Sequence, residues 1–187
     1  MASLQGCYLV APPMLTDDNF FRSVVLVIEH DDEGAIGVIL NRPTADPVRE
    51  VLLMLDEDGL DTTEYGNELI YYGGPVPGPL VVLHKEAEFS ERQILPGIHF
   101  SSQKDNLQKI LALSGRTCRV FSGYAGWAAG QLEGELEMGG WFVVPVGSSD
   151  LFDESDNLWQ SISSSVGMEI LGDMIPPRQI PDDPSVN

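Results

Sequence analysis

Residues 23–43, SVVLVIEHDDEGAIGVILNRP, contain two apolar segments on either side of an acidic turn that ends in Gly34. Two such segments joined by a short polar turn with glycine are typical of a β-hairpin. The run VVLVI at 24–28 is continuously apolar, which is typical of a strand buried on both faces. The stretch therefore predicts a hairpin whose first strand is covered from both sides.

The segments around this hairpin predict further short strands. CYLV begins an early strand that stops at Pro12 and Pro13, because proline removes a backbone donor and favours extended or turn geometry. The loop GGPVPGP at 73–79 is too rich in glycine and proline for regular hydrogen bonding. The other expected strands are ELIYYGG, PLVVLHK, RTCRVFSGY and WFVVP.

Three amphipathic helices are expected between the strands, because apolar residues recur three and four positions apart. The first follows Pro47. The second, SSQKDNLQKILALSG, is predicted to be capped by Ser102, with Asp105 three residues later, and to end at Gly115. The third is DNLWQSISSSVG at 156–167. The inward positions are Val48, Val51, Leu52 and Leu55 in the first helix, Leu107, Ile110 and Leu111 in the second, and Leu158, Trp159, Ile162 and Val166 in the third.

Length and composition indicate one globular domain. The chain has 187 residues, of which 43% are apolar and 21% charged, so it can bury a core without metals or disulfides. Strands interspersed with short helices predict an α+β fold with a mixed sheet. We expect the domain to span residues 1–172, followed by a loose proline-rich tail at 173–187.

The charge balance argues against polyanionic partners. Twenty-nine acidic residues against ten Lys and Arg give a formal charge of −19, which repels nucleic acid and anionic membrane surfaces. No stretch approaches the roughly 18 apolar residues of a membrane span. Cys7 and Cys118 stand far apart without metal-site spacing, so we expect buried free thiols in a reducing cytoplasm.

Residues 123–137, GYAGWAAGQLEGELE, carry four glycines. Because glycine disfavours helix, we expect a strand up to Gly123, an irregular GYAGW turn, and a helix only from about Ala129 through Glu137. The glycines serve either close packing and positive φ, or a cradle for an anion at the helix start. Glu133 near that start would repel a phosphate, so close packing is our main expectation.

Arg42 directly follows the second strand of the hairpin, in the sequence NRP. A guanidinium in this position could bind a carboxylate or phosphate ligand in bidentate fashion. The alternative is a structural ion pair with Glu133 or Glu29. We favour the ion pair because the chain is so acidic.

The histidines and acidic runs do not predict a metal site or a cofactor. His30, His84 and His99 show no zinc-type spacing, and the acidic runs, such as 31–33, miss the register of a calcium loop and read as solvated turns. His84 could act as an acid or base, but a histidine held by hydrogen bonds at a strand end is the commoner arrangement.

Several separate motifs resemble those of the YqgE/AlgH family of bacterial proteins. They are APPMLTDDNFFRSVVLVIEHDDEGAIGVILNRP, YYGGPV, VLH, SGYAGWAAGQLEGELEMGGWFVVP, and DLFD with a later Trp, in this order over about residues 4–171. The resemblance implies a single α+β domain with bent mixed β-sheets flanked by short helices, in the bacterial cytoplasm. It implies no established enzymatic activity. The family is often labelled as transcriptional regulators, without a recognisable DNA-binding motif.

The resemblance also marks residues by position. Ala128 departs from the family pattern, since glycine is common there. The marked residues that we take as a candidate binding or functional surface are Glu29, His30, Asn41, Arg42, Gly73, Gly74, Pro75, His84, Gly123, Tyr124, Gly126, Trp127, Gln131 and Glu133, and the remaining marked residues are Asn19, Arg22, Ser23, Pro43 and Leu132.

Three functions are compatible with these observations. The first is a non-catalytic binding or regulatory domain for a protein or small-molecule partner, with Arg42 and the glycine turn at one surface. The second is a small hydrolase or transferase that uses His84, His30 and Glu29, although Ser122 and Cys118 lack the settings of nucleophiles. The third is a regulator that binds DNA directly, which the net charge disfavours.

Overall fold

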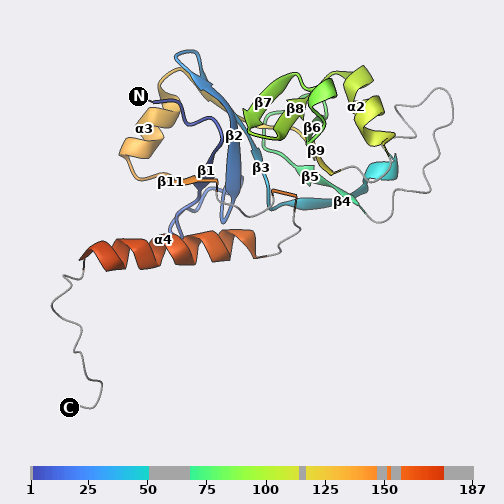
Figure 1. Cartoon of the computed structure of the whole chain (residues 1–187). Coiled ribbons are helices and arrows are strands. Elements are labelled where there is room, and N and C mark those ends of the chain that lie inside the picture. The colour runs from blue at the N-terminus through green and yellow to red at the C-terminus, as the bar shows by residue number, and fades with distance from the viewer. Residues whose placement is uncertain (1, 51–67, 114–116, 147–150, 153–156, 175–187) are drawn as a thin grey trace.

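Two β-sheets form the body of the protein (Figure 1). The structure is a computed structural model, and it describes residues 2–50, 68–113, 117–146, 151–152 and 157–174. Sheet A has the strand order β10-β3-β2-β1-β11, and all its neighbouring strands are antiparallel. Its strands are β1 (Cys7–Val10), β2 (Val24–Asp31), β3 (Gly34–Ile39), β10 (Ala125–Ala128) and β11 (Phe142–Pro145).

Sheet B is mixed, with the strand order β4-β5-β9-β6-β8-β7. Its β5 and β9 are parallel, and the other neighbours are antiparallel. The two sheets with their few helices confirm the predicted α+β class. The strands of sheet B are β4 (Pro43–Pro47), β5 (Leu69–Tyr72), β6 (Val81–His84), β7 (Arg92–Leu95), β8 (Ile98–Ser101) and β9 (Cys118–Ser122).

Helices cover the outer faces of both sheets and one end of the space between them (Figure 1). Helix α3 (Gln131–Glu137) packs on sheet A, and α2 (Lys104–Leu111) packs on sheet B next to the short 3-10 helix η2 (Ala87–Phe89). Helix α4 (Leu158–Met174) adds its first turns to the central core. It runs past the end expected at residue 167, and the predicted tail at 175–187 lies outside the described residues.

The main core lies between the facing sides of the two sheets. Leu26 and Ile28 of β2 point into it, together with Phe121 of β9. Val25 and Val27 of the same strand point to the other side, into the layer beneath α3. Apolar surface is buried most effectively when both faces are covered, so the prediction of a doubly buried first hairpin strand is confirmed.

The chain passes from one sheet to the other at two neighbouring places. The segment 40–42 links β3 of sheet A to β4 of sheet B, and Gly123 with Tyr124 links β9 of sheet B to β10 of sheet A. Backbone hydrogen bonds tie the crossings together, from the Ile39 amide to the Gly73 carbonyl (2.8 Å) and from the Gly73 amide to the Ser122 carbonyl (2.8 Å). Strands that switch sheets in this way turn the corner between two packed sheets.

Bare backbone makes these crossings possible. A Cβ on Gly73 would collide with the Gly123 carbonyl, and one on Gly74 would collide with the Tyr124 backbone. Gly123 has a φ of 72°, and a Cβ there would lie 2.7 Å from the Gly74 carbonyl oxygen. The expectation that the glycines at 123–137 serve close packing and positive φ is therefore confirmed at Gly123. Gly130 has only the positive φ, and Gly134 has neither, since no atom lies within 4 Å of an added Cβ there. Pro75 follows this contact and leads into Val76, which forms an isolated bridge with Tyr124.

The prediction of an irregular turn at GYAGW, residues 123–127, is wrong. Only Gly123 and Tyr124 lie outside the strands, and residues 125–128 pair with β3 as strand β10. The neighbouring strand supplies hydrogen-bond partners that local propensity does not reveal. Helix α3 accordingly begins at Gln131, after Gly130 with a φ of 75°, and not near Ala129.

The predicted Ser102 cap of α2 is also wrong. The helix begins at Lys104, and the Glu91 carboxylate accepts hydrogen bonds from the backbone amides of Ser102 (3.0 Å) and Gln103 (2.8 Å). Burial opposes ionisation, but the hydrogen bonds from Gln103, Asn106 and Ser102 lower the pKa of Glu91. A distant carboxylate thus caps the helix in place of a local hydroxyl, and its charge favours the helix N-terminus.

Other helix boundaries are partly confirmed. The buried stripe Leu107, Ile110 and Leu111 of α2 is confirmed, while the expected end at Gly115 lies outside the described residues. Val48 is buried at the start of a short helical stretch at 48–50. Strands β4, β7 and β8 were not predicted. The expected inward positions Val51, Leu52 and Leu55 lie outside the described residues.

We predict that Gly123→Ala destabilises the protein more than Gly97→Ala does. Both glycines have positive φ (72° and 75°), but Gly97 has no atom within 4 Å of an added Cβ. Both variants should lose about 1–2 kcal/mol for the backbone conformation, and Gly123→Ala about 1–3 kcal/mol more for overpacking. Urea unfolding of both variants measures the difference. Equal losses would show that the crossing tolerates a side chain.

Candidate functional site

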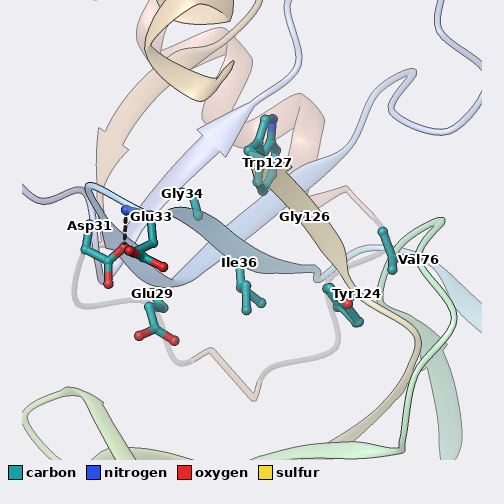
Figure 2. Close-up of a pocket in the computed structure, with 10 residues that line it drawn as sticks. Glu29, Asp31, Glu33, Gly34, Ile36, Val76, Tyr124, Gly126 and Trp127 are labelled. Carbon is teal, nitrogen blue, oxygen red and sulfur yellow. Dashed lines mark hydrogen bonds between the residues drawn. The ribbon is translucent and has the colours of Figure 1, made fainter. Parts of the chain in front are cut away.

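The candidate site is a pocket of about 550 Å³ on the face of sheet A formed by β2, β3 and β10 (Figure 2). Three acidic residues, Glu29, Asp31 and Glu33, line one end of it. Ile36, 38% exposed, lies between them and the opposite end. Val76, Tyr124 and Gly126 line that opposite end, and Gly34, Ala35 and Trp127 complete the lining.

A β-bulge decides which side chains face the pocket. Along β2 and β3, Val27 pairs with Gly37, but the next registered pair is Glu29 with Ile36, so Ile28 is an extra residue. Because side chains alternate along a strand, this extra residue moves Glu29 to the face that carries Ile36. The next pair, His30 with Ala35, then lies on the face beneath α3.

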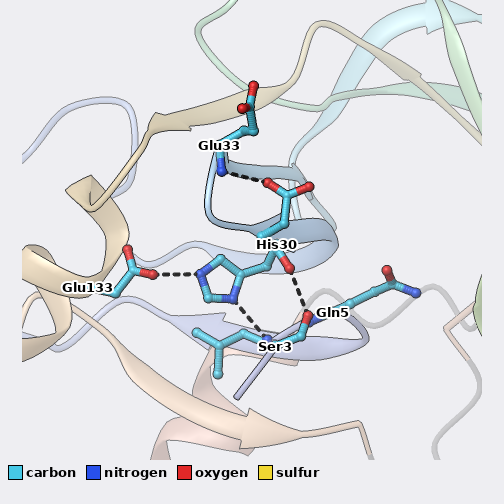
Figure 3. A network of polar contacts seen from close by, with 7 residues as sticks. Ser3, Gln5, His30, Glu33 and Glu133 are labelled. Atoms are coloured by element: carbon cyan, nitrogen blue, oxygen red, sulfur yellow. Dashed lines mark hydrogen bonds and ion pairs between the residues drawn. The ribbon is translucent and has the colours of Figure 1, made fainter. Parts of the chain in front are cut away.

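His30 fastens the N-terminal segment and α3 to sheet A (Figure 3). Its Nδ1 accepts a hydrogen bond from the Leu4 amide (3.0 Å), so its Nε2–H donates to the Glu133 carboxylate (3.0 Å). The Ser3 hydroxyl donates to the His30 carbonyl oxygen (2.9 Å). Hydrogen bonds from the Glu133 backbone amide and from His30 lower the pKa of the Glu133 carboxylate. Both ring nitrogens are thus used in structural contacts.

Asn41 and Arg42 hold the loop that precedes β2. The Asn41 side chain accepts a hydrogen bond from the Val24 amide (2.9 Å) and donates one to the Arg22 carbonyl (2.8 Å). The Arg42 guanidinium donates to the Phe21 carbonyl (3.0 Å). These two predicted site residues therefore support the start of β2 and do not line the pocket.

The predicted ion pair of Arg42 with Glu133 or Glu29 is wrong. Glu133 bonds to His30, and Glu29 pairs with Arg92 of β7 at 2.8 Å. Within the described ranges Arg42 has no ion pair. The reason is its position, because Arg42 and Glu29 lie at opposite ends of the hairpin.

Gln131 and the tryptophans belong to a network beneath and beside α3. The Gln131 side chain accepts a hydrogen bond from the Ala128 amide (3.0 Å) and donates to Glu135 (2.9 Å). Glu135 also accepts hydrogen bonds from the indole N–H groups of Trp127 (2.9 Å) and Trp141 (2.8 Å). Trp127 contributes to the pocket rim, while its ring is buried in this network on the other face of the sheet.

His84 of β6 is fully buried beside Ser101 of β8, near the short helix η2. Ser101 donates its hydroxyl hydrogen to the Phe89 carbonyl, so the His84 Nε2–H donates to the Ser101 oxygen (3.1 Å). Its Nδ1 has no hydrogen-bond partner in the described part of the chain. Burial and the neighbouring His99 lower the pKa of His84 to about 4, so the ring is neutral at pH 7.

The residues proposed for catalysis do not converge. His84 lies in sheet B, His30 lies beneath α3, and Glu29 lies in the pocket. Of the predicted site residues, the pocket brings together Glu29, Tyr124, Gly126 and Trp127.

Six further pocket residues were not predicted as site residues. They are Asp31, Glu33, Gly34, Ala35, Ile36 and Val76. The acidic run at 31–33 was visible in the sequence, but it was interpreted as a solvated turn. An exposed Ile36 beside it was the available signal, because a large apolar residue next to a polar turn often marks a recognition surface.

The described ranges contain neither a cluster of metal ligands nor a membrane-spanning helix. No group of three or more His, Cys, Asp or Glu residues there could hold a metal ion. None of the helices there is long and apolar enough to cross a bilayer. Cys7 and Cys118 were expected as buried thiols outside any disulfide; they are not joined in a disulfide, but both are only partly buried.

Comparison with known proteins points to one family. A protein-family model described as AlgH-like matches residues 8–171 of the chain. The chain belongs to the AlgH-like family. A UPF0301 protein of Streptomyces coelicolor is 37% identical and aligns with 100% of this chain and 97% of its own length. One from Chlorobaculum tepidum is 36% identical, with 88% and 87% covered.

Two solved structures share the fold. The solution structure of AlgH from Pseudomonas aeruginosa has a TM-score of 0.74 and 31% identity, and the match covers 94% of this chain and 96% of that one. A crystal structure of a Corynebacterium diphtheriae protein has a TM-score of 0.67 and 27% identity, with 87% and 86% covered. The resemblance inferred from the motifs is thus confirmed.

We predict that His84 makes the protein less stable in mild acid. Its pKa is lowered from 6.5 to about 4, so the unfolded chain binds this proton more readily, and stability falls as the pH drops from 6.5 towards 4. The contribution is about 1–3 kcal/mol. Urea unfolding between pH 4.5 and 7 should show a shallower decline for His84→Gln than for the parent. Parallel curves would contradict the assignment.

Proposed function

We propose that this AlgH-like protein is a non-catalytic binding or regulatory domain that recognises a positively charged group of a protein or small-molecule partner. The observation that carries the proposal is the pocket of about 550 Å³, with carboxylates at one end and apolar and aromatic surface at the other. Pockets of this size with a few convergent polar groups are typical of ligand sites.

The acidic end is suited to a guanidinium or ammonium group. Glu29 already accepts the guanidinium of Arg92 at 2.8 Å, which shows that its carboxylate is placed for such a contact. Asp31 accepts the Glu33 amide with one oxygen (2.9 Å), and its second oxygen remains for a ligand. Three carboxylates against one arginine leave the pocket negative, and the net charge of −19 attracts cations over a longer range.

The other end is suited to the apolar stem of the same group. Ile36 is partly exposed, and Val76 and Tyr124 line the far side. Lysine and arginine bury their methylene stems along apolar surface while their charged ends stay polar. The Tyr124 ring can also attract a cation through its face.

The lining residues support a non-catalytic role. None of the described residues that line the pocket is a histidine, cysteine, serine or lysine, and the three residues proposed for catalysis lie apart. The free thiols Cys7 and Cys118 support our placing of the domain in a reducing cytoplasm.

We predict that the pocket binds N-butylguanidinium, a guanidinium on a four-carbon stem, more tightly than the uncharged N-butylurea. Titration followed by ¹⁵N–¹H NMR should shift the amides of Ile36 and Gly126. Glu29→Gln, Asp31→Asn and Glu33→Gln should each weaken binding about two- to fivefold. Glu137→Gln, on α3 across the sheet, removes the same charge and should leave binding unchanged.

Two results would contradict this function. One is equal binding of the charged and uncharged probes, or no binding of either. The other is tight, salt-sensitive binding of duplex DNA at physiological ionic strength, which would favour direct DNA binding instead.

A further inference from the structure

Strand β10 forms one edge of sheet A, and most of that edge is already occupied. Tyr124, just before the strand, exchanges two backbone hydrogen bonds with Val76 (2.9 and 3.0 Å). At the other end the Ala128 amide donates to the Gln131 side chain (3.0 Å). Native proteins commonly protect sheet edges with such short contacts.

Gly126 lies between these two contacts and is left open. Backbone groups alternate in direction along an antiparallel strand, so Gly126 points its N–H and C=O the same way as Tyr124 and Ala128. Within the described chain these two groups have no hydrogen-bond partner, and Gly126 is exposed. One donor and one acceptor are therefore presented side by side at the rim of the pocket.

We propose that an extended segment of a partner protein pairs with β10 at Gly126 and places a lysine or arginine side chain in the pocket. This inference rests on the proposed function and adds the form of the partner. Adding a strand to a sheet edge combines main-chain hydrogen bonds for affinity with side-chain pockets for specificity.

The register of sheet A supports this geometry. Gly126 pairs with Ile36, and Ile36 pairs with Glu29, so the three lie in one row across β10, β3 and β2. A partner residue opposite Gly126 would extend this row and share its face. The partner residue and Glu29 are then three strand spacings apart, about 14 Å. A long basic side chain reaching from the partner and the Glu29 side chain reaching from β2 can together span this distance.

The missing side chain at Gly126 opens the way along this row. A Cβ there would lie 3.3 Å from the Tyr124 ring and 3.7 Å from the Val76 side chain. With hydrogen in its place, an incoming stem can lie over the backbone of Gly126, between these two side chains, and then across Ile36. The acidic end of the pocket is reached only beyond that point (Figure 2).

Charge favours a basic partner over a second copy of this chain. Pairing β10 with β10 of another copy would join two chains that each have a net charge of −19, with the acidic end of a pocket on either side of the new seam. Like charges in such an arrangement oppose association. A strand that carries Lys or Arg instead meets charges of opposite sign.

The test compares the peptide acetyl-Arg-methylamide, which is short enough to pair with Gly126 alone, with the same peptide N-methylated at the arginine amide. In a hydrogen-bonded antiparallel pair that amide donates to the Gly126 carbonyl, and methylation removes the donor while keeping the side chain. We expect methylation to weaken binding about tenfold. N-butylguanidinium serves as the probe that needs only the pocket.

Variants at Gly126 provide the reciprocal test. Gly126→Pro removes the outward N–H but leaves the bonds to β3, since proline is tolerated where the N–H of an edge strand faces outward. Gly126→Ala adds a carbon and keeps the donor. We expect the proline variant to lose peptide binding about tenfold relative to the alanine variant, with N-butylguanidinium binding equal in both.

Each outcome decides between the two proposals. If the methylated and parent peptides bind equally while N-butylguanidinium still binds, strand pairing is overturned and the proposed function stands. If neither the small cation nor the peptide binds, both are overturned. A dimer that dissociates in Gly126→Pro but not in Gly126→Ala would show that a second copy occupies the edge, and would also overturn the inference.

Discussion

Close backbone contact where strands cross between the two sheets is the constraint on which the rest of the structure depends. Gly73 and Gly74 meet Gly123 and Tyr124 at distances that leave no room for a Cβ. The same crossing is tied by hydrogen bonds to Ile39 and Ser122. Because β10 leaves this contact directly, its position beside β3 and the position of the pocket follow from it.

A buried arginine strengthens the same region from the side of sheet B. Arg119 of β9 donates to the Leu40 carbonyl (3.2 Å), at the point where β3 leads towards β4, and its guanidinium lies 4.5 Å from the centre of the Tyr71 ring. A buried charge is tolerated only with hydrogen bonds and favourable ring contacts. Three of the described arginines, Arg42, Arg92 and Arg119, each hold a backbone carbonyl or a carboxylate in place.

The bulge at Ile28 separates two neighbouring residues into different roles. Glu29 faces the pocket and His30 faces α3, where it holds Glu133 and the N-terminal segment. Without the extra residue, strict alternation would place Glu29 on the face shared by Val25 and Val27. A single inserted residue therefore lets His30 bond to the N-terminal segment and α3 while Glu29 lies at the negative end of the pocket.

The sequence by itself determined the hairpin, the doubly buried strand, the apolar stripe of α2 and the need for bare backbone at Gly123, since these depend on apolar periodicity and on φ preferences of single residues. Only the tertiary structure decided that Glu91 caps α2, that Arg42 holds a loop carbonyl, and that Glu29, Ile36 and Gly126 form one row. The physical reason is that strand register and bulges arise from pairing between distant segments. Local preference cannot specify which face a side chain reaches once such pairing shifts by one residue.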